Sequence, residues 1–100
     1  MRKITTEAIN AFLSDSDYSK DNTTVYANKY QQSHMILSLH CNAIAEKEIW
    51  KDKSIRITNA GWFSRTTKER LNGIPGVRIN QKAWQWYLNG KAWDGSWIVI

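Results

Sequence analysis

The chain has 100 residues, of which 42% are hydrophobic and 23% charged, as in an ordinary globular protein. This length predicts a single domain, and no apolar run approaches the roughly 20 residues that a membrane span requires. No apolar stretch follows Arg2 and Lys3, so a secretory signal is not expected. We therefore expect a soluble cytoplasmic protein without a membrane partner.

The formal net charge of +5 is distributed unevenly along the chain. Residues 1–24 carry three basic and four acidic groups, residues 25–60 carry five and three, and residues 61–100 carry six and two. A basic C-terminal part suits a polyanionic partner. The excess is modest, however, and many small basic domains bind no nucleic acid.

A helix is predicted over residues 7–13, capped by Thr5 or Thr6, because Ile9, Phe12 and Leu13 form an apolar stripe at helical spacing. The elements expected next are a polar linker (14–23), strands at 24–30 and 34–39 around a turn (31–33), a strand at 42–48, a charged loop (50–53) and a strand at 54–58.

A second helix is predicted to begin at a cap formed by Ser64, Thr66 or Thr67 and to end near Asn72, where the stretch 73–76 supplies Gly and Pro stop signals. Three strands should follow in quick succession. Their connections are predicted from Asn-Gly and Asp-Gly, the strongest short hairpin signals, and from a tight turn before them.

These turns also predict the pairing of the C-terminal strands. A turn at 82–83 places Ile79 opposite Trp86, the Asn89-Gly90 turn places Tyr87 opposite Ala92, and a two-residue turn at 94–95 places Ala92 opposite Trp97. The residues expected on the core face are Val77, Ile79, Trp84, Trp86, Leu88, Trp93, Ile98 and Ile100. Those expected on the outer face are Arg78, Asn80, Gln85, Tyr87, Ala92, Trp97 and Val99.

The chain contains an apparent internal repeat. Residues 5–12 match residues 67–74 in Thr, Glu, aliphatic and Asn positions. By this repeat, Val25, Ala27, Met35, Leu37 and Leu39 point inward in the first half, and Tyr26, Asn28, His34, Ile36 and Ser38 point outward. The predicted fold is α+β: a tandem helix plus three-stranded antiparallel meander, in two similar halves (about 4–58 and 59–100) of one domain, with both helices on one side of the sheet or sheets.

The sequence predicts no enzyme, metal or cofactor, because it lacks a nucleophile elbow, a phosphate-binding Gly-rich loop and paired zinc ligands. Cys41 is the only cysteine, and its neighbour His40 is expected to diverge from it along a strand. Asp94 is explained by turn geometry. We expect all three residues to be structural.

The outer face is the first candidate binding surface. Its partner-binding residues are predicted to be Arg78, Tyr87, Trp97, Tyr26 and Gln85. Aromatic rings beside cations bind single-stranded nucleic acid by stacking, and protein interfaces are also enriched in Trp, Tyr and Arg. A third interpretation is that these aromatic residues complete the core between the halves. Composition does not separate the three.

The second candidate surface is a basic cluster. Arg65, Lys68 and Arg70 are predicted at or near a helix N-terminus, where free backbone N–H groups favour a phosphate of DNA or RNA. The alternative is a solvated helix face, which commonly carries such charges.

The last part of the chain contains a series of motifs: Asn59-Ala60-Gly61-Trp62-Phe63-Ser64, Thr66-Thr67-Lys68-Glu69-Arg70-Leu71-Asn72-Gly73 and Pro75-Gly76-Val77, followed by Trp86-Tyr87-Leu88-Asn89-Gly90-Lys91 and Trp93-Asp94-Gly95-Ser96-Trp97-Ile98. In these motifs the chain resembles a family of small proteins encoded by tailed bacteriophages. The resemblance implies a phage accessory protein in the host cytoplasm, and it implies no mechanism.

The leading hypothesis is a non-enzymatic binding protein that occupies a host protein or nucleoprotein, such as a CRISPR effector, and so counters host defence. The alternative is a nucleic-acid-binding module that uses the basic, aromatic surface. A homodimer joined through the outer face is compatible with either hypothesis.

Overall fold

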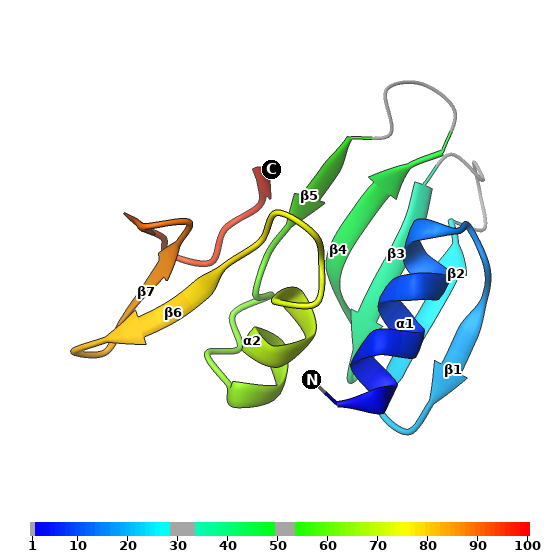
Figure 1. Ribbon diagram of the computed structural model, residues 1–100, viewed down its shortest axis with the longest axis horizontal. Coiled ribbons are helices and arrows are strands. Elements are labelled where there is room, and N and C mark those ends of the chain that lie inside the picture. The colour runs from blue at the N-terminus through cyan, green and yellow to red at the C-terminus, as the bar shows by residue number, and fades with distance from the viewer. Residues whose placement is uncertain (1, 29–33, 50–53) are drawn as a thin grey trace.

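The computed structural model describes residues 2–28, 34–49 and 54–100, and within these ranges it contains two helices and nine strands (Figure 1). In chain order they are α1 (Lys3–Leu13), β1 (Tyr18–Lys20), β2 (Thr23–Ala27), β3 (His34–Leu39), β4 (Asn42–Glu48), β5 (Ile55–Ile57), α2 (Arg65–Leu71), β6 (Ile79–Lys82), β7 (Gln85–Leu88), β8 (Lys91–Ala92) and β9 (Ile98–Val99). The predicted turn at 31–33 and the predicted loop at 50–53 lie outside the described residues.

The strands form two antiparallel sheets, so the predicted α+β class is confirmed. One sheet has six strands in the order β1-β2-β3-β4-β5-β9, and the other has three in the order β6-β7-β8. The prediction of a tandem helix and three-stranded meander is wrong for the first part of the chain, which supplies five strands. It is also wrong for β9, which leaves the second part of the chain to pair with β5.

The helix α1 begins four residues earlier than predicted. Arg2 occupies the N-cap position without a side-chain cap, whereas Thr5 and Thr6 lie inside the helix. The buried Thr5 hydroxyl is engaged by α2 and is therefore not available for capping. In the repeat alignment, Thr5 and Thr67 each take the third position of a helix and are each buried, so the repeat extends to the helices but not to the strands.

The short strand β1 lies in the stretch predicted to be a polar linker. Tyr18 pairs with Val25 at the edge of the six-stranded sheet and packs against the core, and its hydroxyl donates a hydrogen bond of 3.0 Å to Glu7. Burial, and then the Glu7 carboxylate, raise the pKa of Tyr18. Period-two patterning missed this strand because only one of its three side chains is apolar.

The C-terminal meander confirms one predicted turn and corrects another. Asn89 and Gly90 have φ angles of 51° and 86°, as a type I′ turn requires, and Tyr87 pairs with Ala92. The preceding turn uses Ala83 and Trp84 instead of residues 82–83, so Ile79 lies opposite Leu88 and not Trp86. Because this register moves by two residues, Ile79 and Leu88 keep the predicted core face.

The segment after Asp94-Gly95 does not fold back onto β8. The carbonyl oxygen of Gly95 accepts hydrogen bonds from the Thr58 hydroxyl (2.5 Å) and the Asn59 N–H (2.9 Å), which direct the chain to β5. Trp97 therefore does not lie opposite Ala92. Several predicted core residues, Trp84, Ile98 and Ile100, are exposed, whereas two predicted outward residues, Ile36 and Ser38, are buried.

The core joins both parts of the chain. Figure 1 shows α1 lying across β1–β3, and its buried face packs on inward residues of the six-stranded sheet such as Val25 and Leu37. The α2 segment adds Leu71 and Ile74, and the smaller sheet adds Trp86 to the same cluster. No helix in the described ranges is long and apolar enough to cross a lipid bilayer.

A buried polar network fixes α2 against the rest of the core. The guanidinium of Arg70, which is 1% exposed, donates hydrogen bonds to the hydroxyls of Thr23 (3.1 Å) and Thr5 (2.7 Å) and pairs with Glu69. The Thr5 hydroxyl in turn donates to Glu69. A buried cation is stable only when its donors are matched in this way, so the network holds α1, β2 and α2 in one arrangement.

Replacing Arg70 with Met keeps much of the apolar stem and removes these donors. We expect Arg70→Met to lower the free energy of unfolding by about 2–4 kcal/mol, because Glu69 and the two hydroxyls lose their charged partner. Urea denaturation measures the change. The matched control is Arg65→Met on the exposed start of the same helix, which should stay within about 0.5 kcal/mol of wild type. Equal stability of the two variants would contradict this account.

Gly95 is required for two separate reasons. Its φ angle of +89° is left-handed, and an added Cβ would overlap the buried side chain of Asn59. Gly90 has a similar φ of +86° with open space around it. Substitution of the two glycines by alanine therefore distinguishes the cost of backbone strain, present at both, from the cost of overpacking, present only at Gly95.

We expect Gly90→Ala to destabilise the fold by about 1–2 kcal/mol through backbone strain alone. Gly95→Ala should add a further 1–3 kcal/mol, approximately, from overpacking against Asn59. Thermal or urea unfolding of the two variants measures the difference. If Gly95→Ala costs no more than Gly90→Ala, the close packing that directs the chain to β5 is not present in solution.

Candidate binding site

Three of the predicted partner-binding residues lie on the outer face of the three-stranded sheet. Arg78 is exposed just before β6, and Gln85 and Tyr87 lie on β7. The Gln85 amide donates to the backbone carbonyl oxygens of Trp86 (2.7 Å) and Trp93 (3.2 Å), so that side chain supports its own sheet. Tyr87 is half-buried beside Asn80, its cross-strand partner.

The other two predicted residues lie at the larger sheet, Tyr26 in β2 and Trp97 just before β9. Trp97 is 42% exposed, and its ring stacks on the guanidinium of Arg56, which lies 4.8 Å from the ring centroid and pairs with Glu46 at 2.5 Å. Tyr26 is half-buried on β2, with its hydroxyl 3.4 Å from that of Ser38. The predicted set is thus divided between two sheets.

The basic cluster is also divided. Arg70 is buried in the network described above, so the prediction that it contacts a phosphate is wrong. Lys68 lies in the last turn of α2, where its ammonium is 3.1 Å from the Gln81 amide oxygen and 5.6 Å from the Trp86 ring centroid. Only Arg65 lies exposed in the first turn.

Asp94 fixes a local bend and not the predicted two-residue hairpin turn. Its carboxylate accepts hydrogen bonds from the Ser96 hydroxyl (2.7 Å) and then from the Ser96 N–H (3.0 Å), and these bonds lower the pKa of Asp94. A carboxyl group with a lowered pKa stays ionised at neutral pH and is poorly suited to donate a proton.

Among the aromatic residues that the structure describes, the most exposed ring is one predicted to lie in the core. Trp84 is 92% exposed at the tip of the β6–β7 hairpin, where Ala83 and Trp84 have φ angles of 51° and 71°. Positive φ costs about 1–3 kcal/mol for a residue with a bulky side chain. Trp84 therefore combines a strained backbone conformation with an exposed indole ring.

Two further exposed aromatic rings lie just before α2. Trp62 and Phe63 are 59% and 58% exposed, and they follow a turn in which the Trp62 N–H donates to the Asn59 carbonyl oxygen. The Asn59 side-chain oxygen accepts from the Gly61 N–H at 2.9 Å and fixes that turn. Phe63 meets the buried Trp86 edge-on, with ring centroids 5.1 Å apart.

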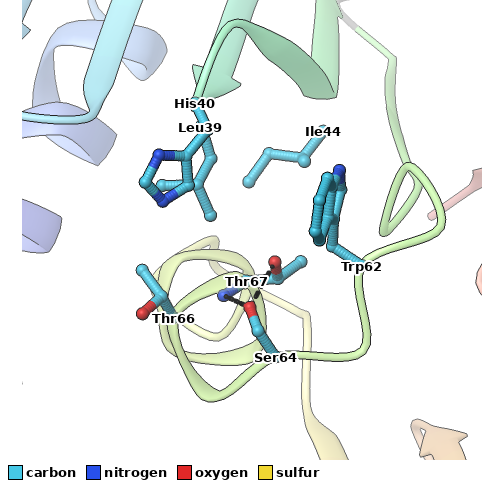
Figure 2. Close-up of a pocket in the computed structure, with 7 residues that line it drawn as sticks. All are labelled: Leu39, His40, Ile44, Trp62, Ser64, Thr66 and Thr67. Atoms are coloured by element: carbon cyan, nitrogen blue, oxygen red, sulfur yellow. Dashed lines mark hydrogen bonds between the residues drawn. The ribbon is translucent and has the colours of Figure 1, made fainter.

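Trp62 forms one wall of a small pocket between the β3–β4 turn and α2. The lining residues are Leu39, His40, Ile44, Trp62, Ser64, Thr66 and Thr67, and the cavity volume is about 190 Å³. Figure 2 shows Trp62 edge-on along one side, His40 along the other, and Leu39 and Ile44 between them above the hydroxyl groups of α2.

The two ends of this pocket are held in place by local hydrogen bonds. His40 and Cys41 form the β3–β4 turn with φ angles of 51° and 67°, and the His40 Nε2 lies 3.3 Å from the Asn22 Nδ2. At the other end, the Ser64 hydroxyl caps α2 by accepting from the Thr67 N–H at 3.2 Å. His40 and Cys41 thus lie in a turn and not along a strand, so the strand geometry expected for this pair is wrong; Cys41 does not line the pocket.

The family of the chain is decided by a family-level match over residues 1–98 to the Kyanoviridae Gp96 protein model. The chain belongs to the Kyanoviridae Gp96 family of phage proteins. The predicted resemblance to a phage protein family is thereby confirmed. No curated protein and no solved structure gives a significant match.

In this Kyanoviridae Gp96 family member, the exposed rings and the pocket were missed for different reasons. The predicted turn at 82–83 lies one residue too early and leaves Trp84 in the following strand, because Trp is not a typical turn residue. Trp62 is close in sequence to the basic cluster, and the prediction for this stretch used only the charged residues as candidate binding groups. The pocket joins residues 39–44 to residues 62–67, which lie at least 18 positions further along the chain, and no local pattern predicts such a contact.

Proposed function

We propose that this phage protein acts without catalysis, by occupying a host protein target through exposed aromatic rings. The observation that carries the proposal is Trp84, which is 92% exposed on a strained two-residue turn. Asn-Gly, the pair used at positions 89–90, would form this kind of turn without strain. A binding role accounts for the retained indole, because buried Trp residues dominate the energy of protein interfaces.

Trp62 and Phe63 support the same role. Together with Trp84 they expose three large rings, two just before α2 and one at the tip of the β6–β7 hairpin, and Figure 1 shows this hairpin extending away from α1 and its sheet. Each ring stands on a hairpin or turn whose backbone is fixed by hydrogen bonds, so little entropy is lost when a partner covers it. Large apolar groups displayed in this way are typical of interaction surfaces.

We further propose that the target belongs to a host defence system, for example a CRISPR effector nucleoprotein. Membership of a phage protein family supports a host target, and the net charge of +5 suits a partner that carries nucleic acid. Under this proposal the aromatic rings provide the affinity, and the basic charge increases the rate of association.

The sharpest test replaces the strained turn by a relaxed one. Ala83→Asn/Trp84→Gly should raise the free energy of unfolding by about 1–3 kcal/mol while it weakens capture of the target at least tenfold. Capture is measured by pull-down from nuclease-treated host lysate followed by mass spectrometry. The control is Trp97→Ala, which removes an aromatic side chain from the other sheet and should leave capture unchanged.

Two results would contradict the proposal. Either no host protein is retained above background by the wild-type chain, or the relaxed-turn variant captures the same protein as well as wild type does. If the wild-type chain captures a protein from untreated lysate and loses it when the lysate is treated with nuclease, the binding occurs through nucleic acid instead.

Nucleic-acid binding is a second candidate function, supported by the outer face of the three-stranded sheet. Residues 77–93 contain Arg78, Lys82 and Lys91 and no acidic residue. Arg78 and Lys82 flank Asn80 along the β6 side of this face, and the half-buried Tyr87 lies opposite Asn80. Cations around an aromatic ring on an open sheet are typical of single-strand binders.

If this function holds, the affinity for single-stranded DNA or RNA should fall with salt in proportion to the phosphates contacted. Arg78→Gln and Lys82→Gln should each reduce the slope of log K against log salt by about 1. Fluorescence anisotropy with labelled oligonucleotides measures both, with Lys20→Gln on β1 as the control. A weak signal that does not depend on salt would exclude this function.

A further inference from the structure

We infer that the pocket between His40 and Trp62 binds one tyrosine side chain of the host protein target. This inference rests on the proposed function, and it specifies which chemical group of the target enters the chain. Three properties of the pocket point to a phenol ring: its volume, a lining without Asp, Glu, Lys or Arg, and an unused hydroxyl proton.

The volume fits one substituted ring. A cavity of about 150 Å³ is sufficient for benzene, whereas sites for drug-sized ligands begin at roughly 300 Å³. The volume of about 190 Å³ therefore suits a six-membered ring with a small substituent. The apolar side chains of Leu39 and Ile44 and the indole of Trp62 provide contacts for such a ring (Figure 2).

The lining contains hydroxyl groups and the imidazole of His40, and no Asp, Glu, Lys or Arg. A nucleobase would bring its phosphodiester to the mouth of the pocket, where a cation would be needed to pair with it. A tyrosine side chain brings no charge. A lining without Lys or Arg therefore favours a side chain of a protein over a base of a nucleic acid.

The hydroxyl groups of α2 have one proton to donate. The Ser64 and Thr67 oxygens lie 2.9 Å apart and share a single hydrogen bond, although each hydroxyl carries a proton. One proton thus remains for an external acceptor. Because Thr67 is 1% exposed whereas Ser64 is exposed at the pocket lining, the free proton is that of Ser64 when Thr67 donates within the pair, and a phenol oxygen would accept this bond.

The exposed wall of the pocket also favours a ring. Trp62 is 59% exposed although it lines the cavity, so an aromatic guest would cover part of its indole. Offset or edge-to-face contact between two rings contributes more than the buried area alone. His40 is held on the opposite side by the strained turn and by Asn22, so the site is formed before a guest enters.

The test titrates the full chain with p-cresol, which reproduces a tyrosine side chain, and with toluene, which lacks the hydroxyl. Shifts in ¹H–¹⁵N correlation spectra report binding. We expect saturable shifts centred on the Trp62 indole and residues 39–44 and 64–67, with p-cresol binding about fivefold more tightly than toluene. Trp62→Ala should weaken both probes, and Trp84→Ala should change neither.

The double variant Ser64→Ala/Thr67→Val removes both hydroxyls, and p-cresol should then bind no better than toluene. A circular dichroism melt checks that α2 persists in this variant. Because loss of the cap lowers stability, the conservative variant Thr67→Ser provides the rescue control: it keeps both hydroxyls of the pair and should retain the preference for p-cresol.

Three results would overturn the inference: no saturable shift, shifts that persist in Trp62→Ala, or tighter binding of 1-methyluracil than of p-cresol. The probes do not depend on a host target. Binding of p-cresol without capture of any host protein would therefore refute the proposed function alone, and capture without binding of p-cresol would refute only this inference.

Discussion

The arrangement of this protein depends on one buried cation. Arg70 lies 1% exposed at the junction of α1, β2 and α2, and its partners Thr5, Thr23 and Glu69 come from all three elements. A buried charge is stable only when its hydrogen-bond donors have acceptors, so this junction favours a single packing of α1, β2 and α2. Because α2 contacts β4 on one side and β6 on the other, fixing α2 also fixes the smaller sheet and the pocket wall.

On this rigid base, two hairpins carry strained turns that display rings. His40-Cys41 and Ala83-Trp84 both have positive φ at two residues that are not glycine. In each, an aromatic side chain stands where Asn or Gly would cost less. Strain that is tolerated at a surface position indicates function more strongly than strain in a core, where packing alone can impose it. The aromatic surface and the pocket are therefore interpreted together as a site of recognition.

The sequence predicted those parts of the fold that local chemistry determines. The strands at 34–39 and 42–48 and the Asn89-Gly90 turn follow from apolar patterning and from the positive φ that Asn and Gly accept. The pairing of β9 with β5 depends on Gly95 packing against Asn59, which is a contact between distant residues. The exposed Trp84 and the pocket beside His40 depend on strained turns without a sequence signal, so local patterns could not predict them.

The central claim is that the Arg70 junction joins the two sheets into one cooperative unit, which keeps the displayed rings in place. Native-state hydrogen exchange tests it most directly, because the opening free energy of each backbone amide is measured separately. The account predicts that amides of α2 and of the β6–β7 pair open with the same free energy as those of β2 and β3. A separate, lower-energy opening of α2 with the smaller sheet would contradict it.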